Sequence, residues 1–375
     1  MDRIDIAIIG GGVVGLAAAS VLAEEGRDVY VFEKNSSFGQ ETSSRNSEVI
    51  HSGIYYPKGS LKSETCIRGN KMLYEICEAN GVPYKKTGKL IIAKDASEGD
   101  ALDALFAQGK ARNLKGLKIL DKKGIKKLEP NIKAFRAIWL PMTGIIDSHS
   151  LMRFFLLKAK SAGGDIIYDS NVTSITRTVS GYEITINAGT NKRVTFIAGI
   201  VINSAGLESD SVSALAGIKK DEYALSYCKG DYFRLVHGKN LLTGRPVYPI
   251  SNPDDTFLGI HVTPDLAGGA RLGPDAEYLG KRTIDYSPNP AKRDIFYDST
   301  KPFLPFLEKE DLRVDTSGIR PKLQREGQGF RDFVIKHEDA AGFKGFINLI
   351  GIESPGLTAA PAIAEKVGQI VNELI

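Results

Sequence analysis

The sequence has few of the residues that build disulfide frameworks and metal sites. It contains three cysteines and five histidines among 375 residues. The cysteines are odd in number and form no CxxC pair, which argues against a disulfide framework, a zinc site or a redox pair. The histidines are scattered without the spacing of metal ligands, so we predict no metal. This use of cysteine is typical of a cytoplasmic protein.

Long apolar runs and a strong charge imbalance are also absent. No apolar run approaches the roughly twenty residues that a membrane-spanning helix needs, and no segment has the pattern of a signal peptide. The formal net charge of +4 is small for this length and does not indicate nucleic-acid binding. We therefore predict a cytoplasmic globular protein without a transmembrane segment, and leave contact with a membrane surface open.

The first thirty-three residues follow the pattern of a dinucleotide-binding unit. An apolar run at 4–9 leads into a glycine-rich turn at 10–15, a helical pattern that ends at Gly26, and a second apolar run that ends at Glu33. The spaced glycines permit a tight turn, close approach of the backbone to a pyrophosphate, and close packing of the helix on the sheet. The helix N-terminus favours phosphate charge, and the acid accepts hydrogen bonds from ribose hydroxyls.

The end of the chain repeats this arrangement of strand, glycine turn and helix, at 345–374. Between the two ends, strand patterns with turn signals dominate residues 220–320. We predict an α/β domain and a second, mostly β domain inserted into it. The first domain comprises 1–81, 143–219 and 321–375, and the second comprises 82–142 and 220–320.

Four local predictions are specific enough to be tested. The pattern at 84–93 predicts a β-hairpin, the pattern at 165–175 a single strand, and the pattern at 302–308 a helix. The long polar loop at 34–47 follows directly from the strand that carries the ribose acid, so we expect it to lie along the rest of the cofactor.

Several strings of residues resemble a known family. The glycine turn with Glu33, the string ETSSRNSEVIHSGIYYPKGSLK at 41–62, INSAGLESD at 202–210 and GIESPGLTAAPAIAE at 351–365 are similar to the FAD-dependent D-amino-acid oxidase and glycine oxidase superfamily. Four further strings resemble its L-2-hydroxyglutarate dehydrogenase/oxidase branch. These are HSGIYYPKGSLK (51–62), KGDYFRL (229–235), GIHVTPDLAGGARLGPDA (259–276) and GIRPKL (318–323).

The resemblance implies a glutathione-reductase-type, Rossmann-like FAD domain in discontinuous pieces, and a substrate domain built on a mostly antiparallel β-sheet. It also implies FAD as cofactor, bound without a covalent bond because 351–358 lacks a cysteine. A helix N-terminus at the closing loop would stabilise negative charge on the reduced flavin. The residues that it assigns to FAD are Gly10, Gly11, Gly12, Val13, Val14, Gly15, Glu33, Lys34, Thr42, Ser43, Ser44, Arg45, Asn46, Ser47, Val172, Ala205, Gly206, Gly351, Ile352, Glu353, Ser354, Pro355, Gly356, Leu357 and Thr358.

Oxidation of a 2-hydroxy acid needs a base for the hydroxyl proton and a cation for the carboxylate. His51 is the first choice for the base and His261 the second, because imidazole titrates near neutral pH. Arg320 is the candidate for the 2-carboxylate, since guanidinium binds carboxylates bidentately. The candidates for a second carboxylate and for hydroxyl contacts are Lys62, Arg271, Tyr56 and Tyr232.

The resemblance therefore implies an FAD-dependent oxidoreductase that converts a small anionic 2-hydroxy acid, first of all L-2-hydroxyglutarate, to the 2-oxo acid. Oxidation of sn-glycerol 3-phosphate or of an amino acid stays open, as does a flavin-binding subunit without turnover. The electron acceptor is equally open between oxygen, a quinone and another carrier.

Overall fold

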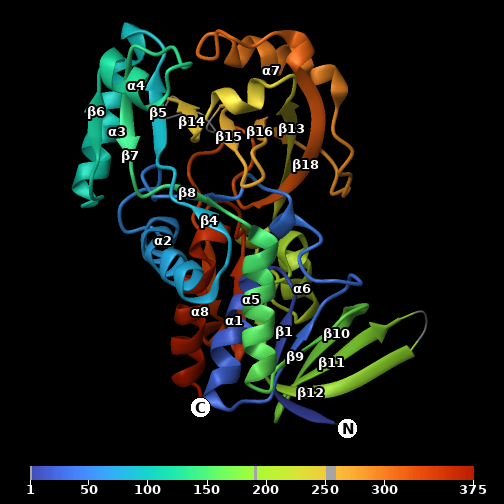
Figure 1. Ribbon diagram of the computed structural model, residues 1–375. Coiled ribbons are helices and arrows are strands. Elements are labelled where there is room, and N and C mark those ends of the chain that lie inside the picture. Colours follow the sequence, from blue (N-terminus) through green and yellow to red (C-terminus); the bar gives the residue numbers. More distant parts are fainter. Residues whose placement is uncertain (1, 190–191, 251–258) are drawn as a thin grey trace.

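The fold is built on two large β-sheets, joined by a small third one (Figure 1). The computed structural model describes residues 2–189, 192–250 and 259–375. Both termini lie at the end of the first sheet that points away from the second (Figure 1). Within the described residues, no helix combines the length and the apolar character needed to cross a membrane.

The first sheet has eight strands, in the order β10-β11-β12-β1-β2-β9 with β20 beside β12 and β19 beside β20. Its centre is parallel, and β10, β11 and β19 pair in antiparallel fashion. The strands are β1 (Arg3–Ile9), β2 (Val29–Phe32), β9 (Asp165–Ile167), β10 (Ser170–Thr178), β11 (Gly181–Ala188), β12 (Lys192–Asn203), β19 (Val334–His337) and β20 (Phe346–Ile350). Strands from the beginning and from the end of the chain thus belong to one sheet.

Helices α1 (Val13–Leu22), α2 (Leu61–Asn80), α5 (Ser148–Ser161) and α8 (Gly356–Asn372) pack together beside this sheet (Figure 1). Their apolar faces and the strands form a continuous core. Helix α6 (Ser209–Leu215) contributes to a second core with β10, β11 and β12. The hydroxyl of Ser60 caps α2 by accepting a hydrogen bond from the Ser63 N–H.

The second sheet has nine strands and is antiparallel except where β14 runs parallel to β5. Its order is β17-β13-β16-β15-β14-β5-β7-β6, with β18 beside β13. The strands are β5 (Lys89–Ala93), β6 (Lys118–Leu120), β7 (Arg136–Leu140), β13 (Ser226–Leu235), β14 (Val247–Pro249), β15 (Val262–Pro264), β16 (Ala270–Leu272), β17 (Glu277–Tyr278) and β18 (Leu312–Lys322). Helices α3 (Gly99–Ala111), α4 (Lys122–Leu128) and α7 (Arg293–Thr300) accompany it. The predicted fold class, α/β with a second, antiparallel sheet, is confirmed, and the proposed domain limits remain a prediction.

The predicted hairpin at 84–93 is wrong. β4 (Tyr84–Lys85) pairs with β8 (Gly144–Ile146) in the three-stranded sheet, which β3 (Val49–Ile50) completes, whereas β5 pairs with β7 and β14. Gly88 lies between them with a φ of +67° and donates its N–H to the Thr143 carbonyl. At this turn the chain passes from the three-stranded sheet into the second large sheet, so residues 84–93 form no hairpin.

Two other local predictions also need correction. The segment 302–308 forms turns and no helix, because Pro305 cannot donate a backbone hydrogen bond there. Its apolar residues Phe303, Leu304 and Leu307 are nevertheless buried in the core of the second sheet. The segment 165–175 is divided between β9 and β10 by a turn at Asp169, whose φ is +51°.

Helices α2 and α8 are in backbone contact. A Cβ added at Gly69 would lie 2.1 Å from the Thr358 carbonyl oxygen, so the two backbones approach each other only because residue 69 is glycine. We expect Gly69→Ala to lower the free energy of unfolding by about 1–3 kcal/mol, because the helices must move apart. Denaturant unfolding monitored by circular dichroism measures the change.

Gly99→Ala is the matched control. Gly99 is the first residue of α3, with helical backbone angles, and a Cβ added there would have no heavy atom within 4 Å. This change should raise stability slightly, by about 0.4–1 kcal/mol. Equal effects of the two substitutions would contradict the close packing at Gly69.

Candidate active site

A cavity of about 870 Å³ lies between the two large sheets. One end is formed by the residues that follow the carboxyl ends of β1, β2 and β12, and the other by side chains of β13, β14 and β18. The loop 39–49 and the start of α8 form walls between these ends. In α/β sheets, ligands bind at the carboxyl ends of the parallel strands, so the position is that of a cofactor site.

The glycine turn lies at the first end of the cavity and leaves no room for side chains. Gly10 has a φ of +108°, and a Cβ there would lie 2.5 Å from the Ser204 carbonyl oxygen. A Cβ on Gly15 would lie 2.1 Å from the Gly10 oxygen. At Gly12 the Cβ would meet the Ser43 hydroxyl at 2.9 Å. The turn is therefore a backbone cradle at the N-terminus of α1, which suits a pyrophosphate.

Glu33 lies directly after β2 and lines the same end of the cavity. Its carboxylate accepts hydrogen bonds from the N–H of Gly11 at 2.7 Å and of Asn35 at 2.9 Å. Burial raises the pKa of Glu33, and these two hydrogen bonds oppose the rise. Each oxygen keeps a lone pair for a further donor, such as a ribose hydroxyl.

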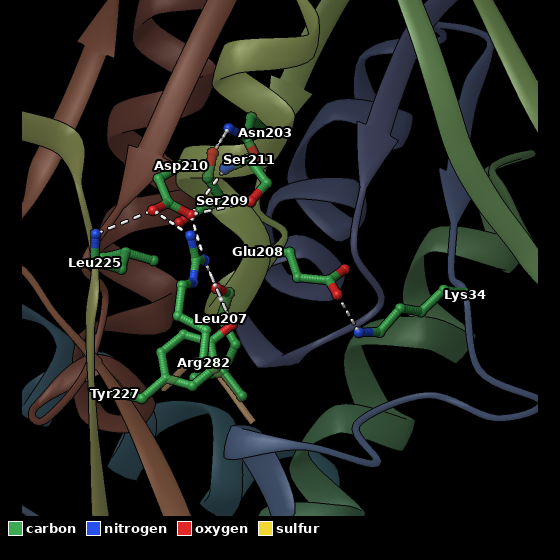
Figure 2. A network of polar contacts seen from close by, with 10 residues as sticks. All are labelled: Lys34, Asn203, Leu207, Glu208, Ser209, Asp210, Ser211, Leu225, Tyr227 and Arg282. Atoms are coloured by element: carbon green, nitrogen blue, oxygen red, sulfur yellow. Dashed lines mark hydrogen bonds and ion pairs between the residues drawn. The ribbon is translucent and has the colours of Figure 1, made fainter. Parts of the chain in front are cut away.

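The turn between β12 and α6 is held from both sides (Figure 2). The Lys34 ammonium lies 3.1 Å from the Glu208 carboxylate and 2.9 Å from that of Glu41. From the other side, Arg282 donates to both oxygens of Asp210, at 2.7 and 2.9 Å. This turn, which includes the cavity residues 205–208, is thereby joined to the loop at 34–41 and to the segment that follows β17.

The polar loop reaches the second sheet. The Thr42 hydroxyl donates to the Ile319 carbonyl at 3.0 Å, and the Ser47 hydroxyl lies 3.1 Å from the Tyr232 hydroxyl. The Arg45 guanidinium stacks 4.0 Å from the centre of the Tyr286 ring. The loop thus spans the length of the cavity, as the sequence predicts.

His51 follows β3 and lies beside the first turn of α8. Its backbone N–H donates to the Thr358 hydroxyl at 3.0 Å, and that hydroxyl donates to the Val49 carbonyl. The His51 side chain lines the cavity and keeps part of its surface accessible. Burial, followed by the charge of Lys89 and by His261, holds the pKa of His51 well below its usual range. The ring is therefore neutral and able to accept a proton at neutral pH.

His261 lines the same end of the cavity, with its ring stacked 3.7 Å from that of Tyr248. Its Nδ1 lies 2.9 Å from the Gly259 carbonyl oxygen, which can only accept, so Nδ1 carries the hydrogen and Nε2 the lone pair. Burial lowers the pKa of His261 to about 3. Nε2 is buried and has no hydrogen-bond partner among the residues that the structure describes.

Cations gather at this end of the cavity. Arg320 and Lys322 of β18 both line it, two residues apart on one strand. Lys62 also lines it, with its ammonium 3.0 Å from the carboxylate of Glu353. Burial opposes the ionisation of Glu353, but Lys62 and Lys322 lower its pKa. The described residues here therefore place three cations around one carboxylate, which favours an anionic ligand.

A profile of the DAO family, described as FAD-dependent oxidoreductase, matches residues 5–370. The chain belongs to this family. L-2-hydroxyglutarate dehydrogenase, mitochondrial, of Arabidopsis thaliana is 37% identical, over 98% of this chain and 83% of that protein. The Homo sapiens protein of the same name is 31% identical, over 99% of this chain and 88% of its own. The chain is thus an FAD-dependent oxidoreductase.

Solved structures show the same fold. L-alpha-glycerophosphate oxidase from Mycoplasma pneumoniae with FAD bound has a TM-score of 0.88 and 27% identity, over 99% of this chain and 95% of that one. Glycine oxidase from Geobacillus kaustophilus has a TM-score of 0.80 and 20% identity, over 100% and 96%. The second likeness concerns the fold alone.

The cavity of this FAD-dependent oxidoreductase fits the cofactor, since the glycine cradle, Glu33 and the start of α8 lie along one continuous space. Most residues assigned to FAD line it. The lining members are Gly10, Gly12, Val13, Val14, Glu33, Lys34, Thr42, Ser43, Arg45, Asn46, Ser47, Val172, Ala205, Gly206, Ile352, Glu353, Ser354, Pro355, Gly356 and Leu357. Gly11, Gly15, Ser44, Gly351 and Thr358 are not part of the lining, although Gly11 donates to Glu33 and Thr358 accepts from His51.

Of the residues assigned to the substrate, Tyr56, Lys62, Tyr232 and Arg320 line the cavity, and Arg271 does not. Its Nε lies 3.8 Å from the Asp315 carboxylate, and its assignment to the substrate stays a prediction. It alternates along β16 with the core residues Ala270 and Leu272, and its guanidinium lies 6.0 Å from the centre of the Tyr232 ring, behind the side chains that line the cavity.

Sequence reasoning missed several residues at the same end of the cavity. Tyr55, Tyr248 and Lys322 line it, together with Gln324 and Phe330 of the loop after β18. Tyr55 and Lys322 lie within strings that resemble the family, which was the available signal. Tyr248 lies on a short strand with no motif, so that only the packing of β14 beside β5 shows its place.

Proposed function

We propose that this enzyme oxidises a small 2-hydroxy acid, and that L-2-hydroxyglutarate, converted to 2-oxoglutarate, is its substrate. Two curated relatives of nearly full length carry the name of that activity. The observation that carries the proposal is that neutral His51 and Arg320 line the same end of the FAD cavity. When bound, FAD supplies the acceptor for the hydride.

Arg320 binds the 2-carboxylate in this proposal. Its side chain lines the cavity and donates to the Asp275 carbonyl, which restrains the guanidinium and leaves its other N–H groups for a ligand. The other cations at this end, Lys62 and Lys322, favour a substrate with a second negative charge. We add Lys322 to Lys62 as a candidate for the distal carboxylate, because it lines the cavity two residues from Arg320 on β18.

His51 takes the hydroxyl proton in this proposal, and His261 is the second candidate. Both rings are neutral, but the His51 side chain is the more accessible from the cavity. The N-terminus of α8, beside His51, presents the positive end of the helix dipole to the site where negative charge increases during the reaction. Helix and base are thus placed together by the hydroxyl of Thr358.

A second candidate substrate is sn-glycerol 3-phosphate, since the glycerophosphate oxidase shares the fold at a TM-score of 0.88 and the cations suit a phosphate equally well. An amino acid and a flavin subunit without turnover are further alternatives. The electron acceptor stays open, and the cytoplasmic location stays a prediction, because the curated relatives are named mitochondrial.

Anaerobic reduction of the bound flavin by a panel of substrates tests the proposal. We expect L-2-hydroxyglutarate to bleach the flavin absorbance fastest, because it combines a 2-hydroxyl with two carboxylates. The panel includes D-2-hydroxyglutarate, L-lactate, glycerol 3-phosphate, glycine and proline. Faster bleaching by glycerol 3-phosphate or an amino acid would identify that compound as the substrate. Absence of bleaching by every compound would favour a flavin-binding subunit without turnover.

We expect His51→Ala to slow flavin reduction by about two to four orders of magnitude, the usual contribution of a general base. The spectrum of the bound flavin should stay unchanged. Stopped-flow single-turnover reduction measures the rate. His149→Ala is the control, since His149 is exposed outside the cavity. An unchanged rate in His51→Ala, with a slow His261→Ala variant, moves the role to His261.

We expect Arg320→Lys to weaken substrate binding by about tenfold or more and to change the limiting rate of flavin reduction less. Lysine keeps the charge but loses the paired N–H groups that hold a carboxylate. The dependence of the reduction rate on substrate concentration separates the two effects. Arg136→Lys is the control, because Arg136 pairs with Asp103 at the surface. An unaltered apparent affinity removes Arg320 from the substrate site.

A further inference from the structure

Lys89 is a buried lysine that the reaction described so far does not use. It is the first residue of β5 and is 1% exposed, and the four residues after it in the strand are apolar and buried. It does not line the cavity. Lysine is rarely buried in this way unless it is paired, because removing an ammonium from water is costly.

Aromatic rings surround the ammonium of Lys89. Its Nζ lies 4.2 Å from the centre of the Tyr248 ring and 5.0 Å from that of Tyr55. No carboxylate among the described residues forms an ion pair with it. Ring faces stabilise a cation without neutralising it. The positive charge therefore acts on whatever else lies nearby.

The rings that contact this charge belong to the active site, since Tyr55 and Tyr248 both line the cavity. Tyr248 stacks on His261, and Cys66, whose thiol lies 3.6 Å from the His51 carbonyl oxygen, also interacts with Lys89. On the other side β7 contributes Leu140, which pairs with Lys89 and does not titrate. The titratable and charged groups around Lys89 and the two histidines are His51 and Tyr55 after β3, Cys66 of α2, Tyr248 of β14, His261 before β15, and Arg320 of β18.

We propose that Lys89 is a positioning residue whose buried charge keeps the imidazoles of His51 and His261 neutral, and thereby extends the working range of the enzyme to lower pH. The proposal rests on the proposed function in that His51 or His261 is taken as the base. Lys89 does not line the cavity, so its charge acts on the reaction through the histidines.

The direction of the effect follows from the charges. Burial is the largest cause of the lowered pKa of both histidines, and the Lys89 charge lowers them further. Burial also lowers the pKa of Lys89 itself, to about 7. Below that pH Lys89 is charged and resists protonation of the rings. Above it Lys89 loses its charge, but the histidines are neutral there in any case.

The same charge destabilises the fold. A lysine whose pKa is lower in the folded than in the unfolded chain costs stability, fully at pH values below about 7 and not at all above about 10.5. Removal of the Lys89 charge should therefore raise the stability of the fold and shorten the pH range of activity at its acid end.

Lys89→Met tests the proposal in the holoenzyme. We expect the acid limb of kcat/KM for flavin reduction to move up by about one pH unit, as removal of a nearby buried charge implies. The ring signals of His51 and His261, followed by NMR with carbon-13-labelled histidine, should titrate at correspondingly higher pH. Only five histidines are present, so His51→Ala and His261→Ala assign the signals. The Tm at pH 6 should equal or exceed that of the wild type.

Three variants complete the test. Lys89→Arg should restore the wild-type acid limb, because it restores the charge, and Lys89→Gln gives a second uncharged variant if Lys89→Met fails to fold. Lys229→Met is the matched control, since Lys229 is another buried lysine, on β13, outside the cavity. It should leave the acid limb and the histidine titrations in place.

Histidine signals that titrate identically in the wild type and in the uncharged variants would overturn the proposal, as would an Arg variant that behaves like Lys89→Met. The NMR titration needs no substrate. A wild-type enzyme that no hydroxy acid reduces would thus defeat the proposed function, whereas unshifted histidine titrations would defeat the role of Lys89 alone.

Discussion

The buried hydroxyl of Thr358 is the contact on which the arrangement of the active site depends. It accepts the His51 N–H and donates to the Val49 carbonyl, so it joins β3 to the first turn of α8. The backbone of α2 reaches the same point through Gly69. Three segments separated by up to about 300 residues therefore meet at one buried side chain. As a result, the candidate base and the N-terminus of α8 lie on the same side of the FAD cavity.

The two ends of the cavity carry different charged groups and therefore suit different parts of the ligands. At the glycine turn, backbone N–H groups and the acid Glu33 suit the phosphates and the ribose of the cofactor. At the other end, Arg320 and Lys322 favour an anion, while His51 and His261 stay neutral. Burial has opposite consequences for the two kinds of group. It makes the cations attract a substrate more strongly, and it keeps the imidazoles neutral at lower pH by making them weaker bases.

The local patterns of the sequence predicted the cofactor end well and the substrate end less well. The glycine turn and Glu33 lie within one βαβ unit, where spacing along the chain determines spacing in the structure. The substrate end draws on β3, β14, β18 and the segment before β15, so no single motif describes it. Arg271 illustrates this, because its guanidinium lies beside Asp315 and Tyr232 without lining the cavity itself, and only the packing of β16 decides that position. Lys89 was missed because one lysine in an apolar strand shows neither its burial nor its neighbours.

The sequence by itself determined that a dinucleotide binds, that the fold is α/β with an antiparallel second sheet, and that His51 and Arg320 are candidates for chemistry. These features follow from short-range periodicity, glycine spacing and family strings. Tertiary structure alone decided that residues 84–93 leave one sheet for another, that Lys62 is paired with Glu353, and that Lys89 packs on Tyr248, whose ring stacks on His261. The reason is physical: burial, ion pairing and pKa depend on which distant segments pack together, and the order of residues along one segment does not contain that information.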